Sequence, residues 1–115
     1  MPVPTEIRLD RATRVLHVTF DDGVQYDLPA EYLRVESPSA EVQGHGPDQK
    51  KIVPRKQSVG IGSIELVGHY AVRLIFDDGH DTGIYSWDYL HDLGAEREQR
   101  WSAYLNALTA RGLSR

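Results

Sequence analysis

Alternation of apolar and polar residues predicts a strand hairpin in the first third of the chain. Residues 6–10 alternate in this way, and residues 15–20 are rich in the β-branched and aromatic types that favour strands. An Asp-Asp-Gly turn leads into another alternating segment at 24–28, and its glycine accepts the backbone angles of a tight turn. Pro29 then suits the first turn of a short helix that ends at Val35.

Similar patterns recur in the second half of the chain. Residues 61–67, 70–76 and 82–85 are predicted strands, and a second Asp-Asp-Gly turn lies between the last two. Ser86 is a suitable N-cap for a short helix that ends at Gly94, and a longer helix is predicted over 95–111. Its apolar residues recur at helical spacing and are expected to pack on the sheet: Trp101, Tyr104, Leu105 and Leu108.

The middle of the chain has little periodicity. Residues 41–58 are predicted to form an extended loop, with a candidate short strand around residues 51–53. Loops of this length in compact domains are uncommon and often functional. Basic side chains concentrate here, at Lys50, Lys51, Arg55 and Lys56. Such a cluster is typical of a solvated loop or of a surface that binds an acidic group.

The two halves of the chain resemble each other. Residues 18–23 followed by 31–33 are similar to residues 74–79 followed by 88–90, with a one-residue difference in spacing. Duplication and the general frequency of Asp-Asp-Gly hairpins both explain this repeat. Two strand–turn–strand–helix units whose strands pair into one antiparallel sheet give a two-layer α+β fold, with short helices and a longer C-terminal helix. We predict a single domain over residues 1–115.

Composition narrows the function classes. The chain is 40% hydrophobic and 26% charged, which is ordinary for a globular protein. It has no cysteine, which excludes disulfides, thiolate metal sites and a cysteine nucleophile. The net charge of −4 argues against nucleic acid and anionic membranes as partners. No long apolar run and no signal-peptide pattern is present, so we expect a cytoplasmic protein.

Histidines provide the main candidate chemistry. His80 follows the second Asp-Asp-Gly turn, His69 lies in another turn, and His45 lies in a glycine-rich part of the loop. With Asp78 or Asp81 they would form an imidazole–carboxylate site of the kind that suits zinc or iron. The histidines show neither a helical i, i+4 spacing nor a His-x-His spacing. Turn histidines with local hydrogen bonds explain the same pattern.

Other motifs carry less weight. Residues 81–83 match the Asp-Thr-Gly triplet of aspartic proteases, but polar turn residues precede them where those proteases have an apolar run. The two acidic turns lack the carboxylate spacing of an EF-hand calcium loop. No serine has a convincing nucleophile setting. The residues thus reveal no self-sufficient catalytic constellation, and we expect a protein that is not an enzyme.

Five segments of the chain match the pattern of a known family. The most specific is the closing Asp-Gly-His…Tyr-Ser-Trp-Asp-Tyr-Leu stretch, and the others are residues 33–42, 44–46, 59–61 and 64–71. Through them most of the chain up to Gly94 resembles the DUF971 family, the small bacterial form of the gamma-butyrobetaine hydroxylase-like N-terminal domain. The resemblance implies an α+β fold, in agreement with the pattern of strands and helices.

The resemblance also indicates which residues of this chain correspond to the zinc ligands of the hydroxylases. In the hydroxylases the corresponding domain precedes an oxygenase domain and binds structural zinc through three cysteines and a histidine. The cysteine positions fall on Ser37, Ser39 and Val42, and the histidine falls on His80. Serine and valine are poor zinc ligands, so we expect no structural zinc and no resident cofactor. A metal held weakly by His80 with His45 is the lower-ranked alternative.

Related domains are attached to Mrp-like P-loop ATPases of iron–sulfur cluster assembly. By this analogy we expect a non-catalytic accessory module that recognises an unknown protein partner, in such assembly or in oxidative metabolism, as a monomer or weak homo-oligomer. The alternative is a metal-binding domain that uses His80 with His45 or His69 and a nearby aspartate. The expected interaction residues are His45, Lys50, Lys51, Arg55, Lys56, Asp78, Gly79 and His80.

Overall fold

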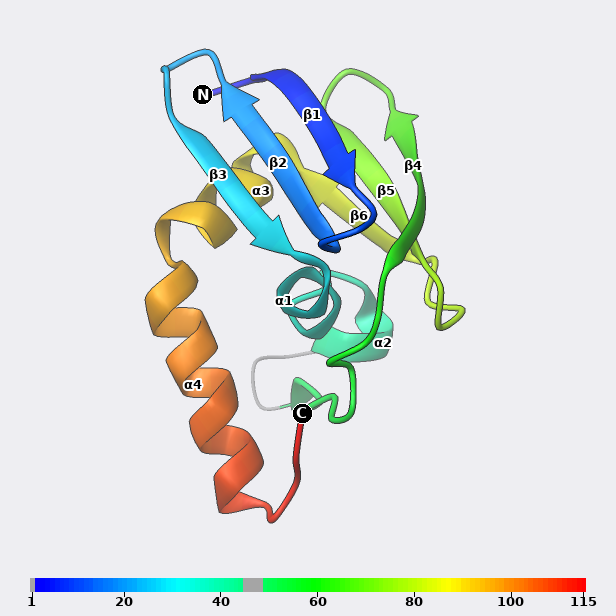
Figure 1. Cartoon of the computed structure of the whole chain (residues 1–115), viewed down its shortest axis with the longest axis vertical. Helices are drawn as coiled ribbons and strands as arrows, with labels where there is room; N and C mark the ends of the chain where they lie inside the picture. Colours follow the sequence, from blue (N-terminus) through cyan, green and yellow to red (C-terminus); the bar gives the residue numbers. More distant parts are fainter. Residues whose placement is uncertain (1, 45–48) are drawn as a thin grey trace.

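The computed structural model describes residues 2–44 and 49–115 (Figure 1). Its strands are β1 (Pro4–Asp10), β2 (Val15–Phe20), β3 (Gln25–Pro29), β4 (Ile61–Val67), β5 (Ala71–Phe76) and β6 (Gly83–Ser86). Its helices are α1 (Ala30–Val35), α2 (Ala40–Gln43), α3 (Trp87–Ala95) and α4 (Arg97–Ala110). The α+β class and the antiparallel hairpins are confirmed. No helix within the described ranges is long and apolar enough to cross a membrane.

The strands form two three-stranded antiparallel sheets, β1-β2-β3 and β4-β5-β6, and not the single sheet that we predicted. The central strands β2 and β5 are each flanked on both sides and bury alternate residues in one shared core. Leu16 and Val18 from β2 and Leu74 from β5 have no exposed surface. The two units therefore meet through apolar faces, and their edge strands do not pair with each other.

The first aspartate of each Asp-Asp-Gly turn makes the same pair of hydrogen bonds. Asp21 accepts from the Val3 amide at 3.1 Å, and its own amide donates to the Val3 carbonyl at 2.9 Å. Asp77 does the same with Gly60, at 3.0 and 2.9 Å. Each aspartate thus fastens its turn to the start of its own sheet.

The helices of the two units also make reciprocal contacts. The Tyr32 hydroxyl on α1 donates to the Leu93 carbonyl on α3, at 2.6 Å, and the Tyr89 hydroxyl on α3 donates to the Glu36 carbonyl at the end of α1. Each tyrosine lies at the same place in its unit. Frequent hairpin chemistry does not account for such crossed contacts, so the structure favours duplication as the origin of the repeat.

The long helix α4 packs differently from our prediction. Tyr104 and Leu108 are buried in a second small cluster with Val35 at the end of α1. Ile52 and Val53 pack against this cluster, and they form no strand, because their segment contacts a helix instead of a sheet edge. Figure 1 shows α4 extending beyond the sheets, with the chain end returning beneath α1.

Gly94 does not end its helix. It lies within α3, which continues to Ala95. A Cβ atom at Gly94 would lie 2.2 Å from the Tyr26 ring, so the glycine permits close packing of the helix on β3. A glycine is indeed required at position 94, but the reason is the close contact with Tyr26 and not the end of the helix.

Candidate functional site

A polar cluster, in which Ser37, Ser39 and His80 are buried and Glu41 and Thr82 are exposed, joins the segment after α1 to the turn between β5 and β6. We call it the His80 cluster; its members are Ser37, Ser39, Glu41, His80 and Thr82. His80 Nε2 lies 2.8 Å from Ser37 Oγ, and His80 Nδ1 lies 2.9 Å from Glu41 Oε2. Ser39 Oγ lies 2.6 Å from Thr82 Oγ1. Two segments about forty residues apart are thereby cross-linked by hydrogen bonds.

The protonation of His80 follows from its partners. The Glu41 carboxylate can only accept, so His80 Nδ1 carries the proton; Nε2 of the neutral ring then accepts from the Ser37 hydroxyl. Burial lowers the pKa of His80, and the nearby Arg34 charge lowers this pKa further, against the opposing effect of Glu41. The ring is therefore neutral at pH 7.

The two units differ at the His80 cluster. His80 takes the position that Val24 has in the first unit, since each amide donates to the second aspartate of its turn, Asp22 or Asp78. Gly83 pairs with Leu74 where Tyr26 pairs with Val18. A Cβ at Gly83 would lie 2.7 Å from Ser37 Oγ. The missing side chain at Gly83 thus leaves the space that the Ser37 hydroxyl occupies.

The order hydroxyl–imidazole–carboxylate is also that of a Ser-His-acid triad. Ser37, however, has no exposed surface, and its oxygen also accepts from the Ser39 amide at 3.2 Å. A nucleophile must reach the substrate carbonyl, which this burial prevents. We therefore assign the arrangement a structural role.

The structure does not bring the predicted metal ligands together. His69 is exposed in the turn between β4 and β5, and Asp81 is exposed beyond the His80 turn. Asp78 contacts His80 only through the His80 amide, at 3.1 Å. Among the described residues, no group of three or more His, Cys, Asp or Glu side chains is placed to hold a metal ion. His45 lies outside the described residues.

Asp78 instead holds two cations. Its carboxylate lies 2.9 Å from Arg34 Nε and 2.7 Å from Lys56 Nζ. Burial alone would raise the pKa of Asp78, but hydrogen bonds from Lys56, the His80 amide and Arg34 hold this pKa at about 2. The ion pair with Lys56 places the basic loop directly beside the exposed turn that contains Gly79.

The predicted basic cluster divides into paired and unpaired side chains. Lys50 pairs with Glu36 at 2.9 Å, as Lys56 does with Asp78. Lys51 and Arg55 are exposed and form no ion pair with any residue that the structure describes. Of the four basic residues in this cluster, Lys51 and Arg55 are thus the two that pair with no described carboxylate.

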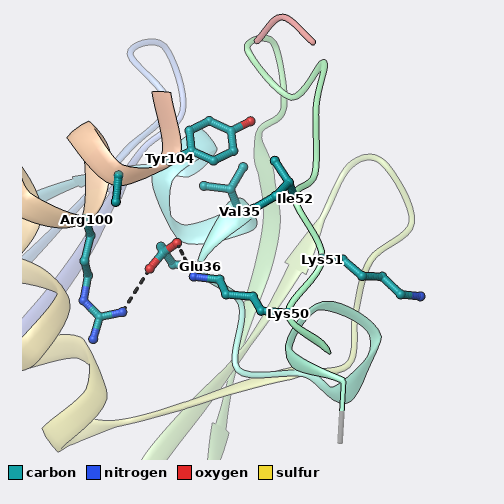
Figure 2. A pocket seen from close by; sticks show the side chains of 8 residues that line it. Val35, Glu36, Lys50, Lys51, Ile52, Arg100 and Tyr104 are labelled. Carbon is teal, nitrogen blue, oxygen red and sulfur yellow. Dashed lines mark hydrogen bonds and ion pairs between the residues drawn. The ribbon is translucent and has the colours of Figure 1, made fainter. Parts of the chain in front are cut away.

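A cavity of about 310 Å³ opens beside Lys50, between the end of α1 and α4 (Figure 2). Glu36, whose side chain is 4% exposed, lies between Lys50 and Arg100 and accepts from both at 2.9 Å. Sequence reasoning missed Glu36 and Arg100. Glu36 directly follows α1 and Arg100 lies on α4, positions where charged residues normally face solvent, and nothing in the sequence indicates that they meet.

The comparisons agree with this architecture. Residues 7–91 match the family described as gamma-butyrobetaine hydroxylase-like, N-terminal, and the chain belongs to this family. Two structures determined by NMR are 46% and 49% identical to it, each over the whole of this chain and 90% or 86% of their own, with TM-scores of 0.86. No curated protein matches.

A crystal structure from Acidithiobacillus ferrooxidans is also similar, and it is described as a DUF971 family protein with unknown function. It is 44% identical, with a TM-score of 0.69, over 81% of this chain and 93% of its own. The suspected family is therefore confirmed, while its function is not given by these relatives.

The residues at the zinc positions do not fit a zinc site. Ser37 and Ser39 offer hydroxyls in place of thiolates, and Val42 is a buried apolar side chain. Both nitrogens of His80 already have hydrogen-bond partners within the cluster. Hydrogen bonds thus connect the same two segments that the resemblance would connect by a metal.

Proposed function

We propose that this protein is a non-catalytic accessory module that recognises another protein. The observation that carries the proposal is the Lys56–Asp78 ion pair, because it joins the basic loop to the turn at Gly79. In the same loop the side chains of Lys51 and Arg55 are exposed and form no ion pair with the described residues. Exposed loops on a rigid scaffold are common sites of recognition.

The same geometry supports a role without catalysis. Ser37 is inaccessible, and the histidine beside it already has hydrogen bonds at both ring nitrogens. Related domains occur attached to ATPases of iron–sulfur cluster assembly. By analogy, this association supports an accessory role in such assembly or in oxidative metabolism. We place the protein in the cytoplasm on its sequence pattern.

A charge reversal tests the proposal. The tagged Lys51→Glu/Arg55→Glu variant and the wild type are purified from the native host, and the proteins that they retain are compared by mass spectrometry. The matched control is Arg8→Glu/Arg111→Glu, which changes the net charge equally at exposed residues elsewhere. We expect a partner that wild type and control retain and the loop variant loses. If all three retain the same proteins, this surface is not the recognition surface.

A further inference from the structure

The cavity beside Glu36 has the composition of an anchor pocket. Val35 and Tyr104 are buried at 2% and 5% exposure and form its apolar wall together with the half-buried Ile52. The Tyr104 hydroxyl donates to the Val53 carbonyl at 2.6 Å, which fixes the ring and the adjoining chain. The wall is therefore already ordered before any ligand arrives.

Cations surround this apolar wall. Figure 2 shows Glu36 between Arg100 and Lys50, while Lys51 extends away from the cavity toward solvent. Glu36 accepts from both of these cations, and Glu96 also accepts from Arg100. Two carboxylates therefore offset the three lining cations Lys50, Lys51 and Arg100, and one positive charge remains. The pocket is thus locally positive in a chain whose net charge is −4.

Arg100 is held firmly at this wall. Its Nε donates to Glu96 at 2.9 Å, and its guanidinium lies 5.6 Å from the centre of the Tyr89 ring. Burial would lower the pKa of Arg100, but the hydrogen bonds with Glu36 and Glu96 raise it, so the side chain stays charged. A fixed cation loses little conformational entropy when it binds an anion.

We infer that this pocket binds an acidic peptide segment of the partner protein, with one apolar side chain between Val35, Ile52 and Tyr104 and carboxylates at Lys50, Lys51 and Arg100. The inference rests on the proposed function and specifies its partner. A cavity of about 310 Å³ lies at the small end of the range for drug-sized ligands, about 300–1,000 Å³, and suits a single side chain. The negative net charge disfavours a polyanionic nucleic acid.

Ala103 provides a direct test, because it lines the pocket and is exposed on α4. Peptides are selected on the immobilised full chain from a random phage-displayed library, and the strongest binder is synthesised. We expect an aromatic or aliphatic residue flanked by Asp or Glu. Its Kd, measured by fluorescence anisotropy, should rise at least about tenfold on Ala103→Trp, which corresponds to about 1.4 kcal/mol. Ala110→Trp, exposed on the same helix and outside the pocket, should leave the Kd unchanged.

A measurement on the wild type makes the test independent of any variant. Amide signals of Val35, Ile52 and Ala103 should shift in NMR spectra during titration with the selected peptide, and rising salt should weaken binding. The inference is overturned if no peptide is selected, if the peptides lack acidic residues, or if Ala103→Trp binds them as tightly as the wild type. A host partner that still depends on Lys51 and Arg55 would then leave the proposed function intact.

Discussion

His80 is a turn residue by sequence and a buried residue in the fold. Only 5% of its surface is exposed, because the segment that contains Ser37 and Glu41 covers it. A neutral imidazole offers one donor and one acceptor, and here the donor meets a carboxylate and the acceptor meets a hydroxyl. The ring therefore satisfies its polar atoms while it lies against Phe76, with ring centres 5.9 Å apart.

Loss of the Ser37 hydroxyl should destabilise the protein. In Ser37→Ala, the buried Nε2 of His80 and the Ser39 amide both lose a partner, which costs roughly 1–3 kcal/mol. Urea unfolding should show a lower midpoint than the wild type. Ser102→Ala, on the exposed face of α4, is the control and should have little effect. An unchanged midpoint in Ser37→Ala would mean that this hydroxyl contributes nothing to folding.

The lowered pKa of His80 predicts a pH dependence of stability. The unfolded chain takes up a proton near the ordinary pKa of about 6.5, whereas folded His80 does so only at lower pH. The unfolded state thus binds more protons just below pH 6.5, so the free energy of unfolding should fall as the pH drops below that value. In His80→Gln this part of the slope should disappear in urea titrations at several pH values. An identical slope in both proteins would contradict the assignment.

At the scale of elements, close packing decides where α3 lies. Gly94 faces the Tyr26 ring on β3, and no side chain fits between them. The hairpins and the helix N-cap at Ser86 were predictable because local turn and capping chemistry determines them. The helix end at Gly94, the strand at 51–53 and the single sheet were predicted wrongly, because each depends on contacts between distant segments.

Gly94→Ala separates the two roles of this glycine. Alanine is about 1 kcal/mol more favourable than glycine inside a helix, so intrinsic propensity alone predicts stabilisation. The clash with Tyr26 should outweigh that gain, with a net loss of about 1–3 kcal/mol in chemical denaturation. In the Tyr26→Ala background the same substitution should no longer destabilise. A stabilised Gly94→Ala single variant would show that the helix end, and not the packing, explains the glycine.

At the scale of the whole molecule, crossed contacts hold the two units together. The helix of one unit reaches the turn of the other: His91 pairs with Asp22 at 3.0 Å, and Arg34 pairs with Asp78 at 2.9 Å. Besides these crossed ion pairs, the second unit contains the His80 cluster. The repeat was visible in the sequence because residues 18–23 resemble residues 74–79. The partners of His80 could not be predicted, since local sequence patterns do not indicate contacts between residues about forty positions apart.

Because hydrogen bonds and not a metal hold the His80 cluster together, metals should not stabilise the protein. A ligand that binds only the folded state raises its melting temperature by mass action. Metal-stripped wild type should melt at the same temperature with and without zinc, ferrous iron, manganese or nickel. Ser37→Cys/Ser39→Cys/Val42→Cys introduces thiolates at the three positions that correspond to the zinc cysteines of the hydroxylase domains, and zinc should raise its melting temperature by more than about 5 °C. A comparable rise in the wild type, lost on His80→Ala, would favour the metal-binding alternative over the plain recognition module.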